Sequence, residues 1–288
     1  MPKLNKLCKY IYERGLLWTC LYIMRSICTG IVYNLQNIIL HIDMYIICIE
    51  KHRYSISHST SLLHVASLYH TVEENRTRWN ACDWSRVSEE WTLHVKKNRG
   101  LDPNRWKILM VNEMILKYIT NDSVVVEIGP GSGRWTEILQ PICIRLLLLD
   151  ISEKCLSICK ERFNMCGNIE YYLIEGIMLN LIAENSIDFI WSYDTFVHIN
   201  PADTEKYIKE FKYILKPGGY AIIHHPGMYS SEIDAKGFFF IRKSCFRSHV
   251  DGLFFTNLIE KYGMELVEQN DSLPHMNGDL ISVFRKPQ

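Results

Sequence analysis

The C-terminal part of the chain alternates short apolar runs with segments of helical periodicity. Runs that are apolar throughout and alternate with helices indicate a parallel sheet with helices on both faces. The last two runs form a hairpin-like pair that closes the sheet. The predicted strands are 124–128, 146–150, 169–176, 187–194, a turn and strand over 216–225, 264–271 and 279–286. The predicted helices between them are 134–139, 152–163, 201–215 and 251–262, and an amphipathic helix is predicted before the first strand, over 107–119.

The first 120 residues have a different pattern. Apolar residues recur in a four-three alternation from Leu17 to Ile42, which places a stripe on one face of a helix. Two interpretations of this helix are favoured: it packs on its own domain or on a second copy of the chain, or it lies on a membrane surface. A third, that it spans the membrane, is disfavoured because polar residues interrupt the apolar run. The domain prediction is an amphipathic segment over 1–50, a linker and helical lead-in over 51–120, and the main domain over 121–288.

The amino-acid composition limits the kinds of binding partner and the cellular compartment that can be expected. The chain has 32 lysines plus arginines and 32 aspartates plus glutamates, so it lacks the basic field expected of a nucleic-acid binder. Its ten cysteines include no Cys-x-x-Cys pair, which is typical of buried thiols in a reducing compartment. We predict a cytoplasmic protein, which contacts the membrane surface if residues 1–50 bind lipid. The oligomeric state is left open.

Three glycines follow the first predicted strand in the stretch "VVVEIGPGSGRWTEIL", Val124 to Leu139. The dinucleotide pattern G-x-G-x-x-G would place its third glycine at position 134, which is Arg134. The acid Glu127 would repel a pyrophosphate but favours a ligand that carries an ammonium and a sulfonium. Asp150 ends the second strand, where it is placed to accept both hydroxyls of a ribose, and Glu175 ends the third, where an adenine edge would lie.

With these motifs in order, residues 122 to 288 resemble the class I S-adenosylmethionine-dependent methyltransferases. The resemblance implies a Rossmann-like α/β fold whose seven-stranded sheet has an antiparallel last strand, here with an N-terminal helical extension. It also implies S-adenosylmethionine as methyl donor. The predicted cofactor-binding residues are Glu127, Gly129, Gly131, Gly133, Asp150, Glu175, Gly176 and Ser192.

A narrower resemblance connects the chain with a bacterial subgroup associated with polysaccharide and other glycan modification. The segments "DWSRVSEEW", "EIGPGSGRWTE", "SYDTFVHI" and "KPGGYAIIHHPG" carry it. The chain departs from that subgroup at Ser88, where glycine is expected before Glu89, and at Glu175, where aspartate is expected.

The segment after the fourth strand, "SYDTFVHINP", bears on the methyl acceptor. It lacks the Asn/Asp-Pro-Pro-aromatic motif that holds a planar amino nitrogen, so a hydroxyl acceptor is predicted. A hydroxyl needs a base, and histidine suits that role. We predict His225 or His198 as the base and Asp194 as the residue that orients the base or the acceptor; the alternative is that these histidines only pack beside the cofactor.

The predicted activity is O-methylation of a sugar or glycan intermediate. A lipid, a quinone or a small metabolite is the alternative acceptor. An alternative of another class is a non-catalytic S-adenosylmethionine-binding scaffold that its N-terminal helix recruits to a partner. Whether the protein binds a divalent metal ion is left open; Asp194 and Asp279 are conceivable ligands.

Overall fold

The computed structural model describes residues 70–84, 90–177, 179, 181–227, 231–233, 239–241, 248, 250–276 and 278–288. The chain divides into two units, Met1–Ile56 with Glu232–Ile241, and Ser57–Ser231 with Arg242–Gln288. The predicted helical segment 1–50 and the linker up to residue 69 lie outside the described residues. Among the helices that are described, none is long and apolar enough to cross a membrane.

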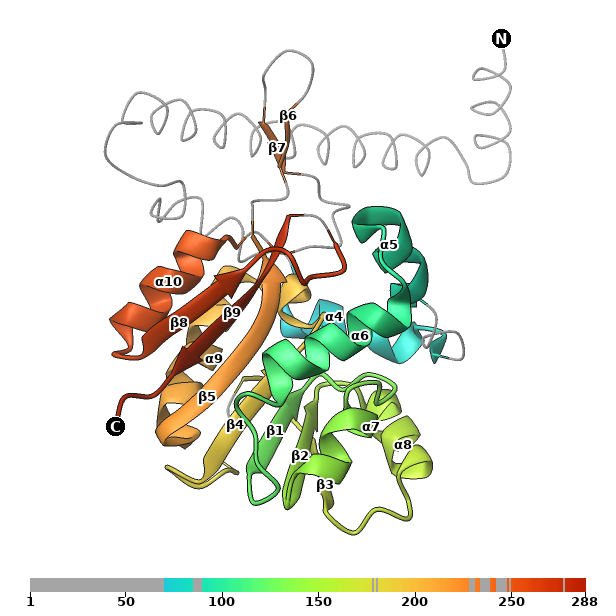
Figure 1. Ribbon diagram of the computed structural model, residues 1–288, viewed down its shortest axis with the longest axis vertical. Coiled ribbons are helices and arrows are strands. Elements are labelled where there is room, and N and C mark those ends of the chain that lie inside the picture. Colours follow the sequence, from blue (N-terminus) through green and yellow to red (C-terminus); the bar gives the residue numbers. More distant parts are fainter. Residues whose placement is uncertain are drawn as a thin grey trace, which may run out of the picture. The chain divides into compact units, whose positions relative to one another are not determined.

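The larger unit is built on a seven-stranded sheet of order β3-β2-β1-β4-β5-β9-β8 (Figure 1). Strands β1 to β5 run parallel to one another, whereas β9 runs antiparallel to both β5 and β8. This confirms the predicted methyltransferase-like sheet with its closing pair. The strands are β1 (Val124–Ile128), β2 (Arg145–Asp150), β3 (Ile169–Leu173), β4 (Ile187–Ser192), β5 (Leu215–Pro226), β8 (Glu265–Asn270) and β9 (Asp279–Arg285). Two further strands, β6 (Ser231–Ile233) and β7 (Phe239–Ile241), form a separate two-stranded sheet.

Helices precede the sheet and connect its strands. They are α4 (Val72–Ala81), α5 (Glu90–Arg99), α6 (Pro103–Met110), the π-helical turn η3 (Val111–Ile115), α7 (Thr136–Leu139), the 3₁₀ turns η4 (Gln140–Ile142) and η5 (Phe196–His198), α8 (Glu153–Arg162), α9 (Pro201–Ile214) and α10 (Gly252–Lys261).

Alternate residues of each strand pack on opposite faces of the sheet, because side chains in a strand point alternately to either side. In β1, Val126 packs in the core that α9 and α10 cover, whereas Val125 packs in the core beneath α6, α7 and α8. Both faces are therefore buried, as the apolar runs predict.

Helix starts follow from local capping. Ser152 accepts the N–H of Cys155 at the start of α8, and Asp251 accepts the N–H of Phe254 at the start of α10. The lead-in helix that the sequence predicts over 107–119 begins earlier, at Pro103, where Asp102 caps it. The helix α4 lies within the segment 51–120 that is predicted as linker and helical lead-in.

Candidate active site

A cavity opens at the carboxyl ends of β1, β2 and β4. Parallel α/β sheets bind ligands at this edge. The structure brings together five of the predicted site residues in its lining, namely Gly129, Gly131, Asp150, Asp194 and His198. The other six, Glu127, Gly133, Glu175, Gly176, Ser192 and His225, are not in that lining.

The three glycines of the loop after β1 have positive φ angles, 69° at Gly129, 57° at Gly131 and 82° at Gly133. A Cβ on Gly129 would lie 2.3 Å from the side chain of Thr195, and one on Gly133 would lie 2.4 Å from the ring of Phe163. Sequence reasoning attributed these glycines to a ligand. The structure gives a second reason, since the backbone conformation and close protein packing also require them.

Glu127 is 2% exposed, and its Oε2 accepts a hydrogen bond of 2.6 Å from the hydroxyl of Thr136. Burial raises the pKa of this carboxyl to about 8, and the hydrogen bond from Thr136 opposes the shift only in part. The uncharged carboxyl is therefore favoured at neutral pH, in contrast with the anionic group that the sequence pattern predicts.

Asp150 ends β2 at the cavity wall and is 6% exposed. Desolvation raises its pKa to about 6, while backbone N–H groups of Ser152 and Gly131 lower it. Its Oδ1 accepts the Ser152 N–H at 2.8 Å. A buried carboxylate held in this way is suited to accept hydrogen bonds from neighbouring hydroxyls of a bound ribose.

Two further predicted cofactor residues, Glu175 and Ser192, form hydrogen bonds within the protein. The carbonyl of Glu175 accepts a hydrogen bond from Arg76. The hydroxyl of Ser192 donates to the carbonyl of Ile128 at 2.9 Å, which ties β4 to β1. The apolar side of the cavity beyond β3 is formed instead by Ile174 and Ile177.

Residues of the lead-in line the cavity, and sequence reasoning did not assign them to the site. They include Asn75 and Trp79 of α4, with Trp84 shortly after it. Asn75 Nδ2 donates to the carbonyl of His198 at 2.6 Å, and the Trp79 ring lies 4.9 Å from the imidazole of His198. Asn75 Oδ1 is buried without a hydrogen-bond donor among the described residues. The crowding of tryptophans before the first strand was the available signal.

His225 is placed away from the cavity, which corrects its prediction as a base. It is fully buried, its Nε2 lies 2.6 Å from the hydroxyl of Ser282, and its Nδ1 lies 2.7 Å from the carbonyl of Pro226. Its ring stacks on Phe255 of α10 at 3.6 Å. Burial lowers the pKa of His225 to about 3, so the ring is a neutral core group. His198 stays a candidate.

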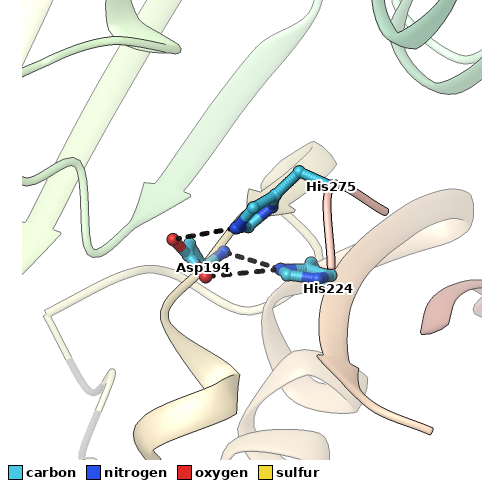
Figure 2. Close-up of side chains that lie close together, drawn as sticks. All are labelled: Asp194, His224 and His275. Carbon is cyan, nitrogen blue, oxygen red and sulfur yellow. Dashed lines mark hydrogen bonds and ion pairs between the residues drawn. The ribbon is translucent and has the colours of Figure 1, made fainter. Parts of the chain in front are cut away.

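Asp194 instead meets two histidines that sequence reasoning did not select as site residues (Figure 2). Its Oδ1 is 3.9 Å from Nδ1 of His224, and its Oδ2 is 3.8 Å from Nε2 of His275. Asp279, a conceivable metal ligand from the sequence, lies behind His224, with Oδ2 3.0 Å from Nε2. His275 comes from the loop between β8 and β9, far along the chain, and no sequence motif marks it.

Comparison with known proteins gives the class of the domain. Residues 126–223 match the family model of a methyltransferase domain. No curated protein matches the chain in sequence.

Solved structures match at the level of the fold. An S-adenosylmethionine dependent methyltransferase from Mesorhizobium loti has a TM-score of 0.51 and 15% identity, covering 63% of this chain and 98% of its own. A putative S-adenosylmethionine dependent methyltransferase from Listeria monocytogenes has a TM-score of 0.51 and 15% identity, covering 64% and 98%. The [4+2]-cyclase SpnF has a TM-score of 0.51 and 14% identity, covering 64% and 81%.

These matches and the sheet topology identify the described domain as a methyltransferase domain with the fold of S-adenosylmethionine-dependent methyltransferases. The chain therefore contains a methyltransferase domain. Its cavity suits that cofactor, because Asp150 and the unsatisfied Oδ1 of Asn75 offer acceptors for hydroxyl and amino donors. S-adenosylmethionine supplies an electrophilic methyl group on a sulfonium.

Proposed function

We propose that this methyltransferase modifies a hydroxyl oxygen of a sugar or glycan intermediate. The observation that carries the proposal is the shared cavity. Asp150 and Gly131 line one part of it, and Asp194 and His198 line another. The residues suited to a cofactor and the residues suited to remove a proton therefore line one cavity, so a hydroxyl bound there can meet both.

His198 and Asp194 are two of the proton acceptors that line the cavity. His198 is held from two sides, by Asn75 on its carbonyl and by the Trp79 ring beside its imidazole. A positioned imidazole contributes roughly 10² to 10⁴ in rate when it takes a proton during a reaction. Asp194 lies at the start of the turn after β4, from which its carboxylate orients the acceptor hydroxyl.

A sugar acceptor is supported by the aromatic wall of the cavity and by the resemblance to glycan-modifying methyltransferases. Trp79 and Trp84 line the cavity, and their centroids lie 6.0 Å apart. Flat apolar rings contact the C–H faces of a sugar, while carboxylates such as Asp194 bind its hydroxyls. A lipid, quinone or small-metabolite hydroxyl is the alternative that an acceptor screen separates from a sugar.

Cofactor binding is the first test. Calorimetric titration of the full chain with S-adenosylhomocysteine should give a micromolar Kd, which Asp150→Asn should weaken at least tenfold because a charged acceptor is lost. Glu153→Gln, an exposed acid at the start of α8, is the matched control and should leave the Kd unchanged. Absence of binding by the folded chain would contradict the proposal. Binding without turnover on any hydroxyl acceptor would favour the scaffold alternative.

The proton acceptor is tested with methyl transfer to a panel of sugars, lipids and small alcohols. His198→Gln should reduce turnover at least tenfold while the Kd for S-adenosylhomocysteine is retained. His94→Gln changes an exposed histidine that is not in the cavity lining, so it controls for loss of a histidine as such. Equal turnover in the two variants would rule out His198 as the base.

A further inference from the structure

We propose that Asp194, His224 and His275 bind a divalent transition-metal ion at the edge of the cavity. The three residues come from three elements, the turn after β4, the strand β5 and the loop before β9 (Figure 2). One ligand atom from each, a carboxylate oxygen and two imidazole nitrogens, lies within 4.8 Å of the others.

The spacing of these atoms suits a single ion. Ligand atoms bound tetrahedrally at about 2.1 Å from an ion lie about 3.4 Å apart. The carboxylate of Asp194 is 3.9 Å from Nδ1 of His224 and 3.8 Å from Nε2 of His275. Both separations are a few tenths of an ångström longer than this and beyond hydrogen-bonding distance, so an ion fits between the groups once they close by that amount.

Both imidazoles are held by their other nitrogen, as metal-binding histidines are. Nε2 of His224 lies 3.0 Å from the carboxylate of Asp279, which is 3% exposed. Nδ1 of His275 lies 2.9 Å from the hydroxyl of Tyr193. The ring of Tyr193 also stacks on His224 at 4.2 Å. These partners fix the two ring orientations and direct the remaining nitrogens to Asp194.

The hydrogen bonds also assign the tautomer of His224. The backbone N–H of Asp194 donates to Nδ1 at 3.1 Å, so Nδ1 carries the lone pair and Nε2 carries the proton toward Asp279. This is the tautomer that a metal on Nδ1 requires. Binding requires the N–H of Asp194 to turn aside. Asp194 has a φ of 63°, which is unfavourable for a non-glycine residue, so a change of this backbone conformation releases strain.

The ligand set and its exposure define the kind of ion and its role. Two imidazoles and one carboxylate favour ions from Mn²⁺ to Zn²⁺ over Mg²⁺ and Ca²⁺, which prefer oxygen ligands. His224 and His275 are buried, whereas the Asp194 side chain is 30% exposed and lines the cavity. Coordination positions would thus stay open toward the cavity. If the proposed O-methylation is correct, an ion there polarises the acceptor hydroxyl. Metal binding itself does not depend on that function.

The test uses the full chain, freed of metal by chelator and dialysis. Titration with Co²⁺, followed by visible absorption, and calorimetry with Zn²⁺ should give one equivalent bound with a Kd of 10 μM or tighter, and Mg²⁺ should bind at least 100-fold more weakly. Asp194→Asn should raise the Co²⁺ Kd at least tenfold, and asparagine tolerates positive φ, so folding should be retained. His275→Gln should do the same. His198→Gln, a cavity histidine outside the cluster, should bind Co²⁺ as the wild type does.

The outcomes separate this proposal from the methyltransferase function. A folded wild-type chain that binds S-adenosylhomocysteine but no stoichiometric Co²⁺ or Zn²⁺ overturns the metal site alone. Co²⁺ affinity unchanged in both Asp194→Asn and His275→Gln also overturns it, because the ion then binds elsewhere. Stoichiometric Co²⁺ binding that both variants weaken supports the site even if no hydroxyl acceptor is methylated. Circular dichroism of each variant identifies any loss of folding.

Discussion

Replacing Glu127 with glutamine should stabilise the protein increasingly as the pH rises. The carboxyl is buried beneath the glycine loop, and desolvation raises its pKa from the usual 4.5 to about 8. The folded chain therefore holds a proton at pH values where the unfolded chain has released it. Because the folded pKa is higher, this group lowers the free energy of unfolding as the pH rises from 4.5 to 8.

The magnitude follows from that interval. Each pKa unit corresponds to about 1.4 kcal/mol, so the 3.5 units between 4.5 and 8 correspond to about 5 kcal/mol. Glutamine does not titrate and retains an oxygen that can accept the Thr136 hydroxyl. The difference in free energy of unfolding, Glu127→Gln minus wild type, should thus increase by about 5 kcal/mol between pH 4.5 and pH 8 and then stay constant.

Urea unfolding of the full chain at half-unit intervals from pH 4 to pH 9 measures this difference. The difference must be used because other buried groups titrate in the same range, and His225 contributes a slope of opposite sign below pH 6.5. Glu161→Gln removes an exposed carboxyl of α8 and serves as the matched control variant. A flat difference for Glu127→Gln would refute the assignment of a raised pKa to this carboxyl.

Three further expectations concern the fold. Gly133→Ala should reduce the free energy of unfolding by roughly 2 kcal/mol or more, because φ is 82° and the new Cβ would meet Phe163. In a double-mutant cycle, Phe163→Leu should recover part of this loss. The wild type should lose stability on acidification from pH 6.5 toward pH 3, because His225 binds a proton there in the unfolded chain but not in the folded one. His225→Gln should remove this loss, which urea unfolding at pH 4 and pH 7 measures. Asp188→Asn should reduce stability by about 1 kcal/mol in the same assay, because the carboxylate accepts the Val124 N–H and pairs with Lys216.

Much of the fold could be predicted from local pattern. The strands 124–128 and 146–150 and the helix that Ser152 caps appear within one or two residues of their predicted positions. Apolar runs and caps act over a few residues, so the sequence carries them directly. The positive φ angles of the loop after β1 can be predicted in the same way, because glycine is the residue that adopts such angles without strain.

Which polar residues meet could not be predicted in this way. His224 and His225 are neighbours in β5, and strand alternation places one beside Tyr193 and the other against Phe255 of α10. The pattern favoured His225, although its neighbour is the residue that faces Asp194.

The sequence by itself determined the sheet, its helices and the position of the ligand edge, because these depend on periodicity, capping and backbone conformation. Only the tertiary structure decided the membership of the site. It placed Asn75 and Trp79 in the cavity wall and carried His275, from the loop between β8 and β9, to Asp194. The physical reason is that long-range contacts depend on how the sheet orders its strands and on which face each side chain occupies.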